Sequence, residues 1–464
     1  NDITVTAWWP YTAGETTPPA VKVKANQSAQ KDFEGSDLIV ADGQTVTYGS
    51  PTLRFTHRTA RVTIVLTDYT EGLASVQLTG LSTEGDNPDI IVPYDKGSNT
   101  YIAIVAPQNV AAGTTFITCT FTNGKTFVYK MKNATDWQAG GEYTYTVSLA
   151  AAKDLGYTIE SDGSYTVTSA DGLMNVAELV NGGKTDINIT LDKNIDLTGK
   201  DWTPIGTNYD NSYKGTFDGG GHTITGLTVT TYDKYAGLFG WLNSAGTVKN
   251  VVMEGVQIQI TNNHSSGFAG GVVGNSWGTI ENCSVSGSVN GEVYVGGVVG
   301  KQTSGSMTGC SSSATVKGTV NVGGVAGESW GSMTACYATG NVTLEIYPGK
   351  DISGGGVVGF KGGNSVLACY ATGNVNSKGS STGNVHIGGL FGYKYATAIA
   401  CYWKNNKEQG IGYNKEGIVT EATKVDGTDV TWQIAVDAMN TALQNAGSEW
   451  RYELKGALPT LRKQ

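Results

Sequence analysis

The sequence predicts a mainly β protein in which an antiparallel β-sandwich is followed by a right-handed parallel β-solenoid with short capping helices. Three observations predict this class. Residues 1–150 alternate apolar and polar side chains and contain no convincing helical stripe. Glycine supplies 65 of the 464 residues, and 40 of these glycines lie between Gly215 and Gly392. A glycine-rich motif recurs six times there, at steps of 26 to 34 residues, a spacing typical of repeat architectures.

The first region is predicted to be a sandwich of short strands. Val62, Ile64 and Leu66 occupy alternate positions and so share one face, as expected of a strand with one buried face. Asn123-Gly124 separates two strand-like segments and supplies the positive φ angles of a type I′ hairpin turn. We place this domain at residues 1–150. The AAAKDLG connection follows, and the second domain covers residues 157–464.

Four segments of the first region resemble the fimbrillin-like family of anaerobic gut and oral bacteria. They are SDLIVA (36–41), LRFTHRTARVTIVL (53–66), AIVAPQ (103–108) and AGGEYTYTVSL (139–149). The resemblance implies a transthyretin-like sandwich in a surface lipoprotein, either a fimbrial subunit or a fimbria-like adhesin. We therefore expect export to the outer membrane or to fimbriae, with lipid anchoring before an N-terminal segment is removed.

The second region repeats a Gly-apolar-apolar-Gly motif with two further markers in phase. The closing glycines are Gly240, Gly274, Gly300, Gly327, Gly359 and Gly392. Nine or ten residues later come Asn250, Cys283, Cys310, Cys336, Cys369 and Cys401, and six residues after these come Val256, Val289, Val316, Val342 and Val375 in five copies. About 26 residues make three short strands and three turns, which is one coil of a parallel solenoid. Such connections are overwhelmingly right-handed.

These copies resemble the GLUG repeat of bacterial surface proteins, and the preceding segment resembles that family's usual lead-in. We place a lead-in cap at 157–235, the repeats at about 236–403 and a C-terminal cap at 404–464. An apolar stripe from Leu173 to Val180 predicts a helix over one open end. A second helix, from about Trp432 to Ala446, is predicted to shield the other end.

The repeated cysteines predict an inward stack of small buried side chains. Free thiols are favoured over disulfides because the count is odd and the steps fit a ladder. The sequence holds no CxxC pair, no histidine cluster and no HExxH motif, so we expect neither a metal nor another cofactor.

Two aromatic rows are the candidate ligand-binding residues. If each cysteine points inward, Tyr337, Tyr370 and Tyr402 point outward on neighbouring coils, and Ser284 and Ser311 continue their row. Corners carry a second aromatic position at Trp277, Trp330 and Tyr395. Such rows suit a sugar face or a partner protein. The alternative is that the tyrosines only pack against each other and cover the sheet.

Other classes of function are disfavoured. The net charge is −9, from 31 Lys and Arg against 40 Asp and Glu, which gives no footprint for nucleic acid. No apolar run is long enough for a membrane-spanning helix. The repeats lack the arginine or paired carboxylates that β-helical lyases and hydrolases need, so we expect no catalysis.

The sequence therefore predicts a surface adhesin or fimbria-associated protein. The sandwich would attach to the surface or to other fimbrial subunits, and the solenoid would recognise a host or bacterial surface glycan or protein. Two alternatives stay open: a structural fimbrial subunit with no ligand, and a polysaccharide-degrading enzyme.

Overall fold

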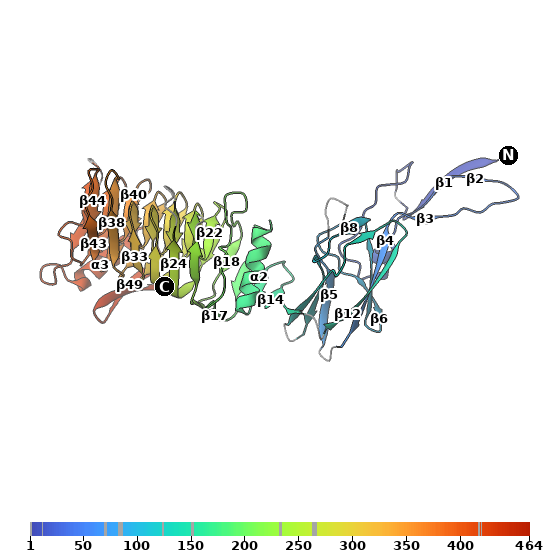
Figure 1. The fold of residues 1–464 in the computed structure, drawn as a ribbon, viewed down its shortest axis with the longest axis horizontal. Coiled ribbons are helices and arrows are strands. Elements are labelled where there is room, and N and C mark those ends of the chain that lie inside the picture. Colours follow the sequence, from blue (N-terminus) through green and yellow to red (C-terminus); the bar gives the residue numbers. More distant parts are fainter. Residues whose placement is uncertain are drawn as a thin grey trace. The chain divides into compact units, whose positions relative to one another are not determined.

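The computed structural model divides the chain into two compact units, Asn1–Thr158 and Ile159–Gln464 (Figure 1). It describes residues 2–11, 13–68, 72–81, 87–122, 125–149, 153–231, 234–261, 267–415, 418 and 420–464. Both units consist mainly of strands, so the chain is mainly β, as predicted. Among the helices in these ranges, none is long and apolar enough to cross a membrane.

Two four-stranded sheets form most of the first unit. One orders β12 (Glu142–Ser148), β4 (Ala60–Thr67), β7 (Thr100–Val105) and β6 (Tyr94–Gly97), and the other orders β13 (Lys153–Asp154), β10 (Thr126–Lys130), β9 (Thr115–Phe121) and β5 (Leu73–Leu78). The smaller elements are a sheet of β1 (Ile3–Trp9), β2 (Ile39–Val46) and β3 (Thr56–His57), the pair β8 (Gln108–Val110) and β11 (Thr135–Trp137), and helix α1 (Gln30–Glu34).

Side chains from both four-stranded sheets share one hydrophobic core. Val62, Ile64 and Leu66 on β4 are at most 1% exposed, and they alternate with less buried neighbours. Phe116 and Ile117 on β9 are fully buried in the same cluster. The period-two pattern of the sequence thus identifies the buried face of β4 correctly.

The pairing differs from the prediction in one place. β12 runs parallel to β4, with Glu142 opposite Arg61 and Ser148 opposite Thr67, so the first unit is not wholly antiparallel. Alternation of apolar residues is the same in either direction, so it could not reveal this. The hairpin of β9 and β10 is antiparallel as predicted, but its turn at Asn123-Gly124 lies outside the described residues. β13 pairs with β10, which extends this unit beyond residue 150.

In the second unit successive coils add parallel strands to three long sheets, two of which begin only at Tyr235 and Phe239. The six-stranded sheet contains β21 (Tyr235–Ala236), β25 (Phe268–Gly270), β29 (Tyr294–Gly296), β34 (Asn321–Gly323), β39 (Ile352–Gly355) and β44 (Val385–Gly388). The seven-stranded sheet contains β22 (Phe239–Leu242), β26 (Val273–Ser276), β30 (Val299–Gln302), β35 (Ala326–Ser329), β40 (Val358–Lys361), β45 (Phe391–Lys394) and β47 (Ile411–Asn414).

The third sheet has 22 strands, because most coils contribute two or three strands to it. Its members up to the first repeat are β14 (Tyr157–Ile159), β15 (Tyr165–Val167), β16 (Ile189–Leu191), β17 (Ile195–Asp196), β18 (Thr216–Asp218), β19 (Thr223–Thr225), β20 (Thr228–Thr231), β23 (Thr247–Lys249) and β24 (Val252–Ile260). The later members are β27 (Thr279–Glu281), β28 (Ser284–Asn290), β31 (Ser306–Thr308), β32 (Ser311–Ser312), β33 (Thr315–Gly318), β36 (Ser332–Thr334), β37 (Tyr337–Ala338), β38 (Val342–Ile346), β41 (Val366–Leu367), β42 (Tyr370–Ala371), β43 (Val375–Gly379), β46 (Ala398–Trp403) and β48 (Thr420–Lys424).

The six closing glycines lie in the seven-stranded sheet, where two layers of backbone meet. A Cβ atom added at any of them would come within 3.0 Å of a main-chain atom. At Gly300 it would lie 2.6 Å from Gly274 O and 2.8 Å from Ala269 N. Real Cβ atoms do not approach backbone this closely, so only glycine fits.

One repeat marker is off by one residue in the first copy. Val252 pairs with Ser284, so Val251, and not Asn250, is the counterpart of Cys283. Asn250 instead matches the left-handed corner residue of later coils, with φ of 55° against 50° for Asn282. A register shift in β24 also places Ile258, and not Val256, opposite Val289. The first copy has a longer corner, which simple counting from the glycine did not reveal.

Both predicted helices form. α2 (Ala170–Asn181) buries Leu173, Val176 and Val180, and the Ser169 hydroxyl caps it by accepting from Gly172 N. Figure 1 shows it beside the first strands of the second unit. α3 (Trp432–Asn445) is followed by the antiparallel pair β49 (Trp450–Lys455) and β50 (Leu458–Lys463). We call these three elements the C-terminal cover.

Candidate functional site

The C-terminal cover lies along the side of the coils, and this corrects the prediction that it shields the open end. Its apolar side chains pack on Ala335, Ala368 and Ala400, which are corner residues of three successive coils. From there the strand pair runs back toward earlier coils. Lys463 Nζ lies 2.9 Å from a carboxylate oxygen of Glu281, and the Trp450 ring fills the space beside Gly309.

The predicted tyrosine row exists, but most of it is not a surface. Tyr337, Tyr370 and Tyr402 are in register on successive coils, and the Tyr337 and Tyr370 rings stack at 4.7 Å and 4°. Tyr370 is 0% exposed and Tyr402 is 8% exposed, because the C-terminal cover packs over them.

Two hydrogen bonds fix this packing. The Tyr370 hydroxyl donates to Pro459 O at 2.5 Å, and the Tyr452 hydroxyl donates to Ala368 O at 2.9 Å. The outward-facing side chain of Tyr370 is therefore a contact site for the C-terminal cover. The expected outward exposure of Tyr370 and Tyr402 is wrong, and of the three tyrosines only Tyr337 stays half-buried.

The five repeated cysteines line the interior in a column. Cys283, Cys310, Cys336, Cys369 and Cys401 are buried free thiols, as is Cys119 in the first unit. Burial raises the pKa of Cys401 to about 12. The Cys369 sulfur accepts a weak hydrogen bond from Cys336 N at 3.4 Å. These contacts are those of small core residues.

The predicted corner aromatics belong to two separate clusters. Trp277 contacts the rings of Tyr209 and Trp241, with centroids 5.7 and 5.9 Å away. Trp330 is 41% exposed and donates from Nε1 to Glu328 at 2.7 Å. The Tyr395 hydroxyl accepts from Tyr393 at 2.9 Å. The structure therefore does not bring Trp277, Trp330 and Tyr395 together into one binding row.

An aromatic position that sequence reasoning missed lies directly after the closing glycine. Phe360, Tyr393 and Tyr413 are in register there and stack at 5.2 and 4.4 Å. Trp241 and Lys301 hold the same position in earlier coils. This row could have been found in the sequence by comparing the residue that follows each GVVG-type motif. Because these rings pile face to face, most of the row presents edges and not faces.

Two buried lysines form a second set that the sequence analysis missed. Lys361 and Lys394 are 0% exposed and lie in register inside the seven-stranded sheet. Lys361 Nζ donates to the backbone oxygens of Gly331 and Gly362, each at 2.7 Å. Burial lowers the pKa of Lys361 to about 7 and that of Lys394 to about 8. The Lys361 amine thereby joins backbone carbonyls of two neighbouring coils.

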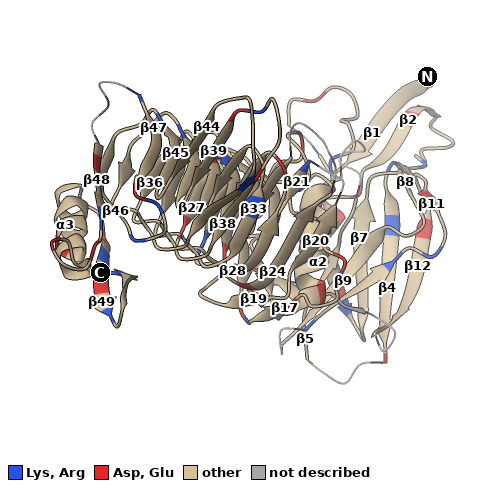
Figure 2. Ribbon diagram, turned by 60° about the vertical axis from the view of Figure 1, so that its left-hand side comes forward, with Lys and Arg blue, Asp and Glu red and all other residues tan. Residues whose placement is uncertain are grey.

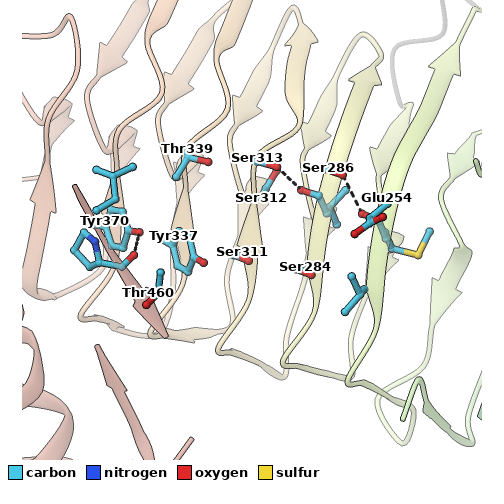
Figure 3. Close-up of a pocket in the computed structure, with 15 residues that line it drawn as sticks. Glu254, Ser284, Ser286, Ser311, Ser312, Ser313, Tyr337, Thr339, Tyr370 and Thr460 are labelled. Carbon is cyan, nitrogen blue, oxygen red and sulfur yellow. Dashed lines mark hydrogen bonds between the residues drawn. The ribbon is translucent and has the colours of Figure 1, made fainter. Parts of the chain in front are cut away.

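The candidate site is a groove between the 22-stranded sheet and the C-terminal cover, shown in Figure 3. Its volume is about 330 Å³. Its floor is a strip of serines from successive coils, its far end is Glu254, and its wall is formed by Leu458, Pro459 and Thr460. We call it the hydroxyl groove. Tyr337 and the buried Tyr370 lie at the end of the groove opposite Glu254.

The hydroxyl groove combines the stacked rings of Tyr337 and Tyr370 with several hydroxyl groups. Ser286 and Ser313 are engaged with backbone oxygens, at 3.4 Å to Met253 O and Val285 O. Within the described residues, the hydroxyls of Ser284 and Ser311 make no hydrogen bond. Figure 3 shows them in line with Tyr337 along the floor. Sequence reasoning did place Ser284 and Ser311 in the tyrosine row, but it could not show the wall that turns the row into a groove.

Charge is sparse over the coils (Figure 2). Glu254 is the one charged residue among those that line the hydroxyl groove. Over the described ranges, no three His, Cys, Asp or Glu side chains come together as ligands for a metal ion.

Two family models match parts of the chain. Residues 1–161 match the fimbrillin-like family. Residues 267–290 and 291–317 match the GLUG motif. Both resemblances read from the sequence are therefore confirmed, and the fimbrillin-like match contains the whole first unit. The GLUG matches cover the coils whose closing glycines are Gly274 and Gly300.

Three known proteins are similar over part of the chain. Halomucin of Haloquadratum walsbyi is 41% identical over 125 residues, 25% of this chain and 1% of its own length. A "Putative Gly-rich membrane protein" of Evansella cellulosilytica is 33% identical over 131 residues, 27% of this chain and 14% of its own length. The chain thus spans a small part of both relatives.

The third is a solved structure, that of a "putative immunoglobulin A1 protease" from Bacteroides ovatus. It has a TM-score of 0.51 at 19% identity, and the match covers 67% of this chain and 95% of that one. At this identity the likeness concerns the fold alone.

Proposed function

We propose that this protein is a cell-surface adhesin associated with fimbriae, in which the first unit attaches and the second unit recognises a ligand. The fimbrillin-like match over residues 1–161 supports a surface, fimbria-associated role. The observation that carries ligand recognition is the hydroxyl groove, a concave site with a half-buried tyrosine and unengaged hydroxyls on a stack of paired strands. Attachment at the outer membrane or to fimbriae, and the lipid anchoring implied by the family, belong to the proposal.

We also propose that the first unit is a transthyretin-like sandwich and that the second unit is a right-handed solenoid. The shared core of two four-stranded sheets supports the sandwich. The parallel, in-register pairing of each coil with the next supports the solenoid. A stack of this kind positions side chains of successive coils in straight rows, which is how one surface is built from distant parts of the sequence.

We further propose that the protein is not an enzyme. Glycoside hydrolysis by the usual mechanisms needs two carboxyl groups about 5 to 9.5 Å apart. Of the residues that line the hydroxyl groove, Glu254 alone carries a carboxylate. The groove therefore supports binding better than bond cleavage.

The test is binding of the intact chain, coupled to beads, to arrays of host and bacterial surface glycans and matrix proteins. We expect saturable binding to a restricted set of these targets. Beads carrying thermally unfolded chain are the control, because they present the same composition without the groove. Absence of saturable binding to every target would overturn the recognition role.

A structural fimbrial subunit is the second candidate, and the edge strand β1 favours it. β1 is paired with β2, and Ile3 and Trp9 on it are 62% and 53% exposed. An accessible edge can accept a strand from another subunit. Concentration-dependent assembly of the purified chain, measured by light scattering, would support this candidate. A monomer at all concentrations would argue against it.

A further inference from the structure

We propose that the hydroxyl groove binds a neutral pyranose-containing glycan, with one sugar ring stacked on the open face of Tyr337. The inference rests on the proposed function and specifies its ligand class and its site.

The stacking surface exists because the tyrosine pile stops at Tyr337. One face of this ring is covered by Tyr370 at 4.7 Å with 4° between the planes. On the other side, the residue in register is Ser311, whose small side chain cannot cover a ring. The second face of Tyr337 is therefore left to the groove that it lines. Flat aromatic faces suit the apolar face of a sugar, which carries axial C–H groups.

The hydroxyl groups of the floor supply the polar contacts that a sugar requires. Ser284 and Ser311 each offer a donor and two acceptor lone pairs, and neither hydroxyl is engaged within the described part of the chain. Glu254, at the far end, has an exposed carboxylate that can accept from sugar hydroxyls in charge-assisted hydrogen bonds. The groove thus carries an apolar contact at one end and an acceptor at the other.

The charges favour a neutral ligand over an acidic one. No lysine or arginine is among the residues that line the groove. Lys463, on the strand that forms its wall, is engaged by Glu281 at 2.9 Å and by Glu449 at 3.2 Å. A uronic or sialic acid would bring its carboxylate into a site whose one formal charge is negative, so it would be repelled.

The site is also formed before the ligand arrives. Tyr337 is fixed by Tyr370, and Tyr452 lies edge-on at 6.5 Å. The floor consists of strands paired on both sides, so little conformational entropy is lost on binding. A volume of about 330 Å³ is at the lower end for small-molecule sites, which fits one or two sugar rings of a longer chain.

The experiment uses the intact chain and two matched substitutions. Ser311→Tyr extends the tyrosine pile by one coil, so it covers the open face of Tyr337 with a side chain that later coils already carry there. Thr315→Tyr adds the same ring to an exposed position of the same coil outside the groove. Both variants are first checked for unchanged thermal unfolding.

Binding is measured by saturation-transfer NMR and calorimetry. The probes are cellotetraose, maltotetraose, xylotetraose and tetra-N-acetylchitotetraose, with tetragalacturonate as the acidic probe. We expect at least one neutral probe to bind with millimolar affinity or better, and tetragalacturonate at least tenfold more weakly. Ser311→Tyr should weaken the neutral probe at least tenfold, Thr315→Tyr less than twofold, and Glu254→Gln several-fold.

Two results would overturn the inference. One is an equal affinity of wild type and Ser311→Tyr for the neutral probe, which would place the sugar elsewhere. The other is the absence of binding to all four neutral probes. If the array binding of the intact chain persists in either case, the adhesin proposal stands with a different ligand or face. If array binding is lost as well, both proposals fail.

Discussion

Replacement of Tyr370 by alanine tests whether the C-terminal cover is held in place by its contacts with the stacked rings of Tyr337 and Tyr370. The side chain is 0% exposed, stacks on Tyr337 and meets Trp432 and Tyr452 edge-on at 5.2 and 5.7 Å. Truncation of a buried aromatic residue costs about 3–5 kcal/mol, and loss of the hydrogen bond to Pro459 adds about 1 kcal/mol. We therefore expect Tyr370→Ala to lower the free energy of unfolding of the second unit by about 4–6 kcal/mol.

The assay is chemical unfolding of the intact chain followed by tryptophan fluorescence, since Trp432 and Trp450 lie in the affected cluster. Limited proteolysis should in addition release the C-terminal cover first. Tyr370→Phe is the matched control: it keeps the ring and loses the hydrogen bond, so it should cost only about 1 kcal/mol. If Tyr370→Ala costs less than about 1 kcal/mol and leaves proteolysis unchanged, the cover does not depend on these contacts.

Three other perturbations test the coil interior. Gly300→Ala, whose Cβ would lie 2.6–2.9 Å from three main-chain atoms, should destabilise the second unit by at least about 3 kcal/mol. The control Gly267→Ala, whose Cβ would have its nearest contacts at 3.4 and 3.5 Å, should change stability little. Equal effects of the two variants on thermal unfolding would contradict the close backbone packing at Gly300. Val299→Asp buries an unpaired charge at a fully buried site, so hydrogen exchange should show loss of protection in more than one coil, and loss confined to one coil would speak against coupled repeats. The pKa of Lys361 is lowered by burial to about 7, against about 10.4 in an unfolded chain, so the unfolded state binds the extra proton and stability should rise from pH 7 to pH 9.5. In urea unfolding, the stability of Lys361→Met should rise less with pH than that of the wild type. An identical dependence of stability on pH would mean that the Gly331 and Gly362 carbonyls keep the amine charged.

The repetitive part of the fold could be predicted because one physical constraint recurs in each coil. Each closing glycine lies where two backbones approach closely, so the spacing of Gly274, Gly300 and Gly327 gives the number of residues per coil directly. The buried column of cysteines follows from the same register. Counting fails where a corner is longer, as between Gly240 and Val251, because a loop can absorb residues without disturbing the strands around it.

The site could be predicted only in part, since it depends on contacts between distant segments. Tyr370 and Tyr337 look identical in the sequence, and only the position of the C-terminal cover leaves one fully buried and the other half-buried. The apolar stripe of α3 indicates that the helix covers something, but it does not say which surface. The parallel pairing of β12 with β4 is equally invisible to an alternating pattern.

The C-terminal cover has a consequence for how the number of coils can vary. Its helix sits on the last coils, while Lys463 near its end reaches Glu281 several coils earlier. Removing one coil between these anchors would shift them by about 4.8 Å relative to each other, the spacing between neighbouring strands. The cover would then miss either its aromatic contacts or its ion pair. In most repeat arrays a unit can be gained or lost freely. Here the C-terminal cover spans a fixed number of coils, so a change in that number would require matching changes at both of its contacts.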